Sequence, residues 1–129
     1  MSSIFTKIVA GEIPCYKIAE NDKFLAFLDI QPLVIGHVLV IPKVEIDYIF
    51  DLEDDLLSEM MIFSKYVSHK IKKSIDCKRV GVTVIGLEVP HAHIHLIPIN
   101  SIADMNFNLP KLKLSSDELN DIAKLIKSN

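Results

Sequence analysis

The stretch 90–98 constrains this chain more than any other, because three histidines alternate in it with apolar residues. Side chains on a strand point to opposite faces with a period of two, so the three imidazoles must share one face: His91, His93 and His95. The apolar residues between and after them then face a core: Ala92, Ile94 and Leu96. The pattern therefore predicts a strand over 91–99 that carries a row of imidazoles on one side.

A row of three imidazoles calls for a functional explanation. Each buried imidazole needs hydrogen-bond partners, and adjacent imidazoles repel one another once they are protonated. Histidines that only filled positions in a strand would carry this energetic cost without a functional benefit. Two kinds of chemistry remain open from the residues alone, namely phosphate transfer and metal binding.

Phosphate transfer would use one of the histidines as a nucleophile. A neutral imidazole can attack phosphorus at pH 7 and form a covalent phosphoramidate that water later opens. The attacking ring needs an acceptor at its other nitrogen, and neighbouring donors must hold the phosphoryl oxygens. The middle histidine, His93, has such neighbours on both sides. His37, alone in an apolar stretch, is the candidate for a fourth member, and this mechanism requires no metal ion.

A metal site would use the same imidazoles, since they are good zinc ligands, with His37 as a possible fourth. No Asp, Glu or Cys interleaves with the three histidines, however, and three successive positions on one strand face converge poorly on a single ion. An H-E-x-x-H pattern is also absent from the sequence. Metal binding is therefore the weaker of the two interpretations.

The rest of the chain indicates one α+β domain. At 129 residues, half of them hydrophobic, the chain can bury a single core. Turn residues separate five apolar or β-branched runs that predict strands: 15–20, 23–28, 37–42, 80–85 and 91–99. We expect these to form a mainly antiparallel sheet of about five strands, with one long and one or two shorter helices. Residues 100–113, which include Pro110, are predicted to be irregular.

Three segments have the spacing of amphipathic helices. Residues 4–11 place apolar side chains on one face and end at Gly11. Between residues 51 and 79 a longer apolar seam has acidic residues at its start and basic residues at its end, which complements the helix dipole. The last helix, 115–128, opens with Ser115 and Glu118 at capping-box spacing.

Charge and segment composition exclude several classes of partner. The formal net charge of -3 argues against bulk nucleic acid, because that affinity depends on Lys and Arg that neutralise phosphates. No signal-like start and no apolar run long enough to cross a bilayer occurs. Two isolated cysteines, Cys15 and Cys77, fit a reducing compartment. We therefore expect a cytoplasmic protein with neither membrane nor nucleic-acid partners.

The histidine-rich stretch and three further blocks resemble the histidine triad (HIT) family. The family signature is His-φ-His-φ-His-φ-φ, where φ is apolar, and residues 91–97 satisfy every position. The other common blocks of the family have similar counterparts here, in the same order: 4–14, 26–30 and 36–43. The resemblance predicts a single HIT domain over 1–129, with a core at 4–99 and a C-terminal extension that carries the 115–128 helix.

The resemblance also implies a reaction and a site. Members of the nucleoside phosphoramidase-like branch are homodimers that bind purine nucleotides, such as AMP or GMP derivatives, and cleave them at the α-phosphorus. By position, His93 would be the nucleophile that becomes nucleotidylated, and its hydrogen-bonding and phosphate-binding neighbours would be His91, His95 and His37. Asp29 would hold the ribose hydroxyls, for which a carboxylate at a strand end is suited independently. The base would lie in an apolar slot formed by Phe5, Ile8, Ile13, Phe27 and Ile30.

Two departures from the family pattern bear on these predictions. Ser3 and Thr6 stand where some bacterial members carry a Cys-x-x-Cys pair that binds structural zinc, so we expect no metal and no cofactor. Glu88 stands where the better-studied phosphoramidases carry a serine that assists the leaving group. A carboxyl with a raised pKa could donate the same proton.

Several alternatives stay open at this point. The same pocket could serve a dinucleoside polyphosphate hydrolase or a non-catalytic, regulatory nucleotide-binding protein, and a metal-binding β protein is a third possibility. The segment after residue 100 could pack on a dimer or shape the leaving-group side. Apolar positions beside the seam of the long helix suggest a dimer or belong to the core: Leu57, Met61 and Ile62.

Overall fold

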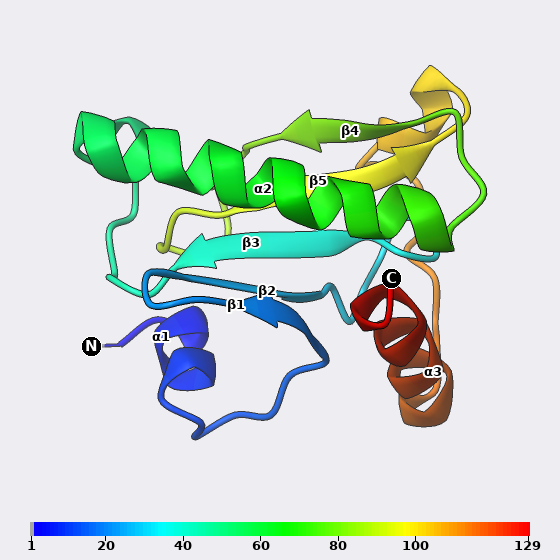
Figure 1. Ribbon diagram of the computed structural model, residues 1–129, viewed down its shortest axis with the longest axis horizontal. Coiled ribbons are helices and arrows are strands. Elements are labelled where there is room, and N and C mark those ends of the chain that lie inside the picture. The colour runs from blue at the N-terminus through cyan, green and yellow to red at the C-terminus, as the bar shows by residue number, and fades with distance from the viewer. Residues whose placement is uncertain (1) are drawn as a thin grey trace.

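Antiparallel pairing of five short strands forms one sheet in the order β1-β2-β3-β5-β4 (Figure 1). The computed structural model describes residues 2–129. Its strands are β1 (Lys17–Glu20), β2 (Phe24–Leu28), β3 (Val38–Pro42), β4 (Arg79–Thr83) and β5 (Ile94–Ile99). The predicted α+β class with a five-stranded antiparallel sheet is therefore confirmed.

Three α-helices accompany the sheet, and the longest lies across it (Figure 1). They are α1 (Ile4–Val9), α2 (Asp54–Ser74) and α3 (Ser116–Lys127). Ser115 and Glu118 form the predicted capping box, in which each side chain accepts from the other residue's backbone N–H. α3 packs on β1 and α2. Along residues 2–129, no helix combines the length and the apolar character needed to cross a membrane.

Some predicted boundaries are wrong, and the one at β5 matters for the site. The strand expected over 91–99 begins only at Ile94. The reason is long-range: the N–H of Ala92 donates to the carbonyl of Ile46, in the connection after β3, instead of to a strand ladder. The turn before it is closed by a bond from the His91 N–H to the Val89 carbonyl.

Smaller differences occur elsewhere in the chain. β4 was expected at 80–85 but spans Arg79–Thr83, and α2 starts after a short 3-10 turn, η1 (Ile49–Asp51). Within the segment expected to be irregular, a second 3-10 turn, η2 (Ile102–Met105), forms because the Asp104 carboxylate accepts backbone N–H groups at its start.

The two faces of the sheet carry different layers. One face packs against α2 and α3 in the main core, to which alternate strand residues contribute: Phe24, Ala26, Leu28, Val38, Val40, Ile94 and Leu96. α2 buries most of its predicted seam there: Met60, Phe63, Val67 and Ile71. The opposite face holds a smaller apolar cluster with α1: Phe5, Leu25, Phe27, Leu39 and Ile41. The histidines of the triad lie on the side of this smaller cluster.

Candidate active site

A cavity of about 650 Å³ opens on the α1 side of the sheet. Two of the three triad histidines, His93 and His95, line it together with His37, Asp29 and Glu88. The apolar residues predicted to hold a base also line it: Phe5, Ile8, Ile13, Phe27 and Ile30. The fold thus brings the predicted site residues into one cavity, except for His91, which lies outside its lining.

His93 is held in one tautomer by the main chain. Its Nδ1 lies 2.7 Å from the carbonyl oxygen of His91, and because a carbonyl only accepts, Nδ1 must carry the proton. The lone pair of neutral His93 is therefore on Nε2. Within residues 2–129 nothing hydrogen-bonds to that Nε2, and the edge of the Phe5 ring packs against the imidazole at 5.1 Å between centroids. A buried, neutral imidazole with an unused lone pair is what nucleophilic attack requires.

The ring of His91 is fully occupied by hydrogen bonds. Its Nε2 donates to the carbonyl of Pro42 at 2.8 Å, so Nδ1 is the acceptor, and the Ser3 hydroxyl donates to it at 2.8 Å. Burial lowers the pKa of His91, which keeps the ring neutral. Neither nitrogen is left for a phosphate oxygen. The contribution of His91 to the cavity is therefore its carbonyl, which orients His93.

Glu45 completes the support of His91. Its carboxylate accepts from the Ser3 N–H and from the Thr6 hydroxyl, each at 2.6 Å. The two bonds hold the pKa of Glu45 down at about 2. Ser3 and Thr6, the two hydroxyl residues at the positions of the family's Cys-x-x-Cys pair, thus join a carboxylate to the first histidine of the triad. The sequence offered little sign of Glu45, because its partners lie about forty residues away.

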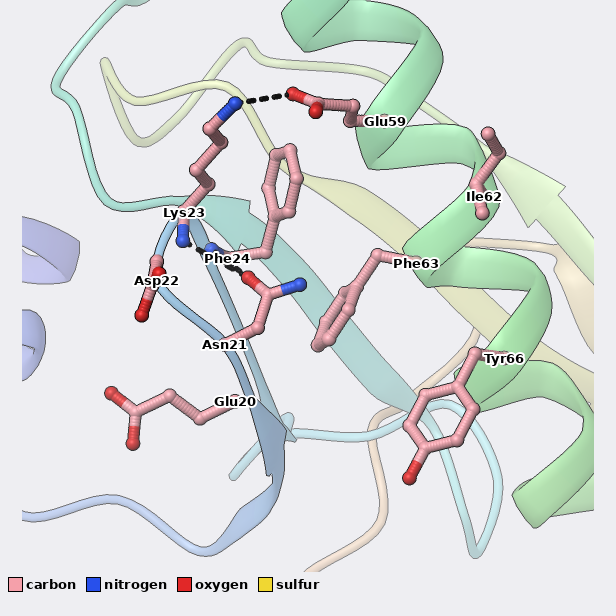
Figure 2. Close-up of a pocket in the computed structure, with 9 residues that line it drawn as sticks. All are labelled: Glu20, Asn21, Asp22, Lys23, Phe24, Glu59, Ile62, Phe63 and Tyr66. Carbon is pink, nitrogen blue, oxygen red and sulfur yellow. Dashed lines mark hydrogen bonds and ion pairs between the residues drawn. The ribbon is translucent and has the colours of Figure 1, made fainter.

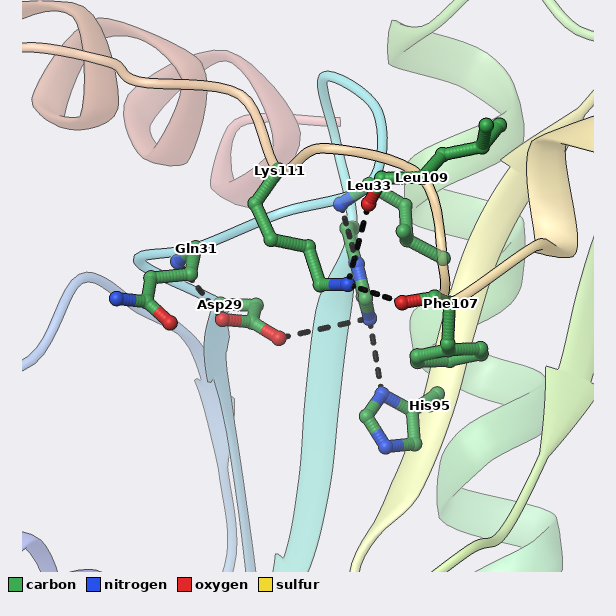
Figure 3. A network of polar contacts seen from close by, with 8 residues as sticks. Asp29, Gln31, Leu33, His95, Phe107, Leu109 and Lys111 are labelled. Atoms are coloured by element: carbon green, nitrogen blue, oxygen red, sulfur yellow. Dashed lines mark hydrogen bonds and ion pairs between the residues drawn. The ribbon is translucent and has the colours of Figure 1, made fainter.

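A second chain of hydrogen bonds sets the tautomers of His37 and His95 (Figure 3). The N–H of Leu33 donates to His37 Nδ1 at 3.0 Å, so the proton of neutral His37 is on Nε2. His37 Nε2 donates in turn to His95 Nδ1 at 2.9 Å. The proton of His95 is therefore on Nε2, and within residues 2–129 that N–H has no acceptor. It is available as a donor to a ligand.

Burial keeps this pair uncharged at neutral pH. Desolvation, and then the neighbouring imidazole, lower the pKa of His37 to about 3. The same causes lower the pKa of His95 to about 4, with His93 as its neighbour. Both rings therefore act at pH 7 as hydrogen-bonding groups without net charge.

Asp29 follows β2 directly and is tied to the loop that leads to β3. Its N–H donates to the His37 carbonyl at 3.0 Å, and its Oδ1 accepts from the Gln31 N–H at 2.9 Å. Oδ2 lies 3.7 Å from His37 Nε2 (Figure 3). Burial raises the pKa of the carboxyl. The position at the strand end and within the cavity is the one predicted from the sequence.

Asp29, His37 and His95 also bring possible metal ligands within 4.8 Å of one another, the only such group among residues 2–129. The hydrogen bonds argue against an ion there. A metal at His37 Nε2 would force its proton to Nδ1, where it would face the N–H of Leu33. Two donors would then oppose each other in a buried place. The geometry therefore fits a proton network better than a metal centre.

The segment after β5 contributes side chains that the sequence did not single out. Phe107 packs its ring edge against His95, with centroids 5.0 Å apart. Phe107, Asn108 and Lys111 line the cavity, and the Leu112 N–H bonds to the Pro32 carbonyl at 2.9 Å. The segment thus shapes the cavity within one chain. Only the isolated aromatic and lysine in a polar stretch could have indicated this, and that signal is weak.

Glu88 lies at the mouth of the cavity, and a second hollow lies elsewhere on the surface. Glu88 is exposed and stands at the rim of the cavity that holds the histidines. The second hollow lies between the β1–β2 turn and α2 (Figure 2). It contains the exposed ion pair of Lys23 and Glu59, at 2.8 Å, and no histidine or cysteine. The side chains that could act in catalysis therefore lie in the first cavity, which holds the histidines.

The sequence and the fold match those of a known family. Residues 10–102 match the model of the HIT domain, so the chain belongs to the HIT family, as predicted. Adenosine 5'-monophosphoramidase hnt1 of Schizosaccharomyces pombe is 35% identical over 134 residues, which cover 99% of this chain and 98% of the relative.

Solved structures agree with this assignment. A HIT-like protein from Bartonella henselae has a TM-score of 0.85 at 26% identity, with 98% of this chain and 95% of the other covered. A zinc-bound histidine triad family protein from Mycobacterium smegmatis has a TM-score of 0.81 at 25% identity, with 99% and 92% covered.

Proposed function

We propose that the protein is a purine nucleotide hydrolase or transferase that cleaves nucleoside 5'-phosphoramidates or related derivatives at the α-phosphorus. One observation carries the proposal: His93, whose Nδ1 donates to the His91 carbonyl, presents a Nε2 without a hydrogen-bond partner among residues 2–129, in the same cavity as the unused Nε2–H of His95. A nucleophile beside a donor for the phosphoryl oxygens is the pair that such a reaction needs. The phosphoramidase named among the relatives supports the reaction class.

The reaction would proceed in two steps. His93 Nε2 attacks the α-phosphorus, a P–N bond to the imidazole forms, and the bond from phosphorus to the leaving group breaks. The His91 carbonyl accepts from Nδ1–H and stabilises the positive charge that develops on the ring. Glu88, exposed at the rim of the cavity, takes up a proton from solvent and passes it to the leaving group. Water then attacks the same phosphorus, the P–N bond to Nε2 breaks, and the proton of the water returns through Glu88 to solvent, which releases the nucleoside monophosphate and free His93.

The nucleotide would lie along the cavity. Asp29 accepts hydrogen bonds from the ribose hydroxyls, and the base occupies the apolar end: Phe5, Ile8, Ile13, Phe27 and Ile30. The reaction needs neither metal nor cofactor. We also propose the cytoplasmic location that the sequence predicts, where purine nucleotides are available to such a site.

We also propose that the protein is a homodimer. Of the three apolar positions predicted at a dimer face, Met61 and Ile62 are exposed on α2, whereas Leu57 packs against the main core. Tyr66 and, on the edge strand β4, Val82 are exposed as well. An apolar helix face and an unpaired strand edge are surfaces that a second copy can cover.

The test is hydrolysis of adenosine 5'-phosphoramidate in excess EDTA by the wild type, His93→Ala and the control His69→Ala, an exposed residue on α2. We expect turnover by the wild type and the control and none by His93→Ala, with AMP binding kept in all three. Turnover by His93→Ala would contradict the covalent mechanism. AMP binding without any turnover would favour a regulatory nucleotide-binding protein instead.

A further inference from the structure

The charges that line the cavity do not suit an anionic ligand at first sight. Asp29 and Glu88 are acidic, and the three lining histidines offer hydrogen bonds. His37 and His95, whose pKa values are about 3 and about 4, carry no charge at neutral pH. A nucleotide brings at least one negative charge to its phosphate, and two nearby carboxylates would repel it.

Lys111 is the only lysine or arginine of the described residues that lines this cavity. Its charge already acts on the site, because it adds to the lowering of the pKa of His37 and offsets part of the rise that burial causes in the pKa of Asp29. Figure 3 shows the Lys111 side chain extending from its segment into the region of Asp29, Phe107 and His95. The cation therefore lies on the side of the cavity where the ribose and the phosphate would be.

The ammonium is held in place but not neutralised. It donates to the Phe107 carbonyl at 2.6 Å and, more weakly, to the Leu109 carbonyl at 3.5 Å. An ammonium has three donors, so one remains for a ligand. Over residues 2–129 no carboxylate lies within 4.0 Å of it. Its charge is thus available to a bound anion.

The segment that carries Lys111 is fixed on both sides of it. Phe107 packs against His95, and the N–H of Leu112 bonds to the Pro32 carbonyl. A cation fixed before binding loses less conformational entropy when the ligand arrives. The arrangement therefore describes a prepared anion site and not a lysine that swings in from solvent.

We propose that Lys111 is a specificity-determining residue whose ammonium binds a phosphate oxygen of the nucleotide, so that the cavity selects nucleotides over nucleosides. The inference rests on the proposed function, because it names the group that recognises the substrate of the same site. It assigns a charged contact with the substrate to the C-terminal extension, beyond the shaping of the cavity by Phe107 and Asn108.

The test compares AMP with adenosine, which lacks the phosphate, by calorimetric titration of the wild type, Lys111→Gln and Lys111→Arg. Lys113→Gln is the matched control, because it removes the same charge from an exposed lysine two residues away. We expect Lys111→Gln to weaken AMP binding about tenfold or more, the size of a lost charge-assisted hydrogen bond, and to leave adenosine binding within about twofold. Lys111→Arg and Lys113→Gln should stay close to the wild type.

The outcomes separate the two proposals. If the wild type binds neither ligand, the proposed function fails and this inference fails with it. If the wild type binds AMP but Lys111→Gln binds it equally well, only this inference is overturned. An equal loss of AMP and adenosine in Lys111→Gln would also overturn it, because Lys111 would then hold the segment and not the phosphate.

Discussion

Ile94 and His93 are neighbours in the chain, yet they belong to layers of opposite character. Ile94 lies in the main core, where α2 and α3 cover the sheet. His93 faces the smaller layer beneath α1, where five buried apolar residues stand beside polar ones. Neutral imidazoles buried there lose hydration, as their lowered pKa values at positions 37 and 95 show. One face of the sheet thus supplies most of the stability, and this stability permits the other face to bury imidazoles that serve the reaction.

The largest effect expected of a single substitution is on the core face. Ile94→Ala should lower the free energy of unfolding by about 2–5 kcal/mol, because it leaves a cavity at a side chain that is 1% exposed. The activity of the folded fraction should stay within about twofold. Urea unfolding of Ile94→Ala beside His93→Ala measures the contrast, since the latter should change stability by only about 1 kcal/mol.

A loss of stability in His93→Ala as large as that in Ile94→Ala would contradict this division of roles, because the two faces would then contribute equally to folding.

The next effect concerns acid. In the unfolded chain His37 and His95 take up protons near their ordinary pKa of 6.5, whereas the folded values are about 3 and about 4. As pH falls from 6.5 toward 4, the unfolded state therefore binds more protons. Each imidazole should remove about 1.4 kcal/mol of stability per pH unit in this window, and stability should return as pH rises. Asp29, with its raised pKa, acts in the opposite sense.

Urea unfolding at several pH values between 4 and 7 measures this slope. His37→Asn should flatten it, and His69→Asn, at an exposed position on α2, should leave it unchanged. An unchanged slope in His37→Asn would mean that the pair is not the source of the acid sensitivity.

A smaller effect is expected at the start of α3. Ser115→Ala removes the side chain that accepts the N–H of Glu118 at 3.1 Å, and should cost about 1 kcal/mol of stability. Thermal unfolding checks the loss, and kcat should not change because α3 covers the core face. A fall in kcat would show that the α3 cap also fixes the segment at 106–113. The core face would then affect the active site as well as stability.

The smallest effect concerns the support of His91. Glu45→Gln weakens the bonds that hold Ser3 and Thr6, and should lower kcat by about fivefold, the size of one modest hydrogen bond, with KM nearly unchanged. Steady-state kinetics check this against Glu59→Gln, which alters an exposed ion pair elsewhere. Equal kinetics in both variants would mean that the carboxylate does not position the triad.

Much of the fold followed from local patterns. Alternation around Ile94 separated the two faces correctly, and the spacing of Ser115 and Glu118 located the start of α3. The start of β5 was missed because the partner of the Ala92 N–H is the carbonyl of Ile46, and no local pattern encodes a contact over that separation.

The site residues, too, divide into those that local patterns predicted and those that depend on long-range contacts. The residues predicted for the cavity came from motif blocks and strand ends, and all but His91 line it. Lys111 and Glu45 escaped notice because each acts on residues far away in the sequence. The tautomers of His37 and His93 depend on the backbone N–H of Leu33 and the backbone carbonyl of His91. Side-chain patterns in the sequence therefore do not reveal these tautomers.

The bond from the Leu33 N–H to His37 has a consequence for how this position can vary. The donor is a main-chain group, so nearly any side chain at residue 33 preserves the direction in which His95 offers its proton. Proline is the exception, because it has no N–H, and it would let the imidazole pair reverse its polarity. Because the bond places a demand on the main chain and none on the side chain, residue 33 would look unimportant in a comparison of sequences, although its N–H decides which nitrogen of His95 faces the cavity.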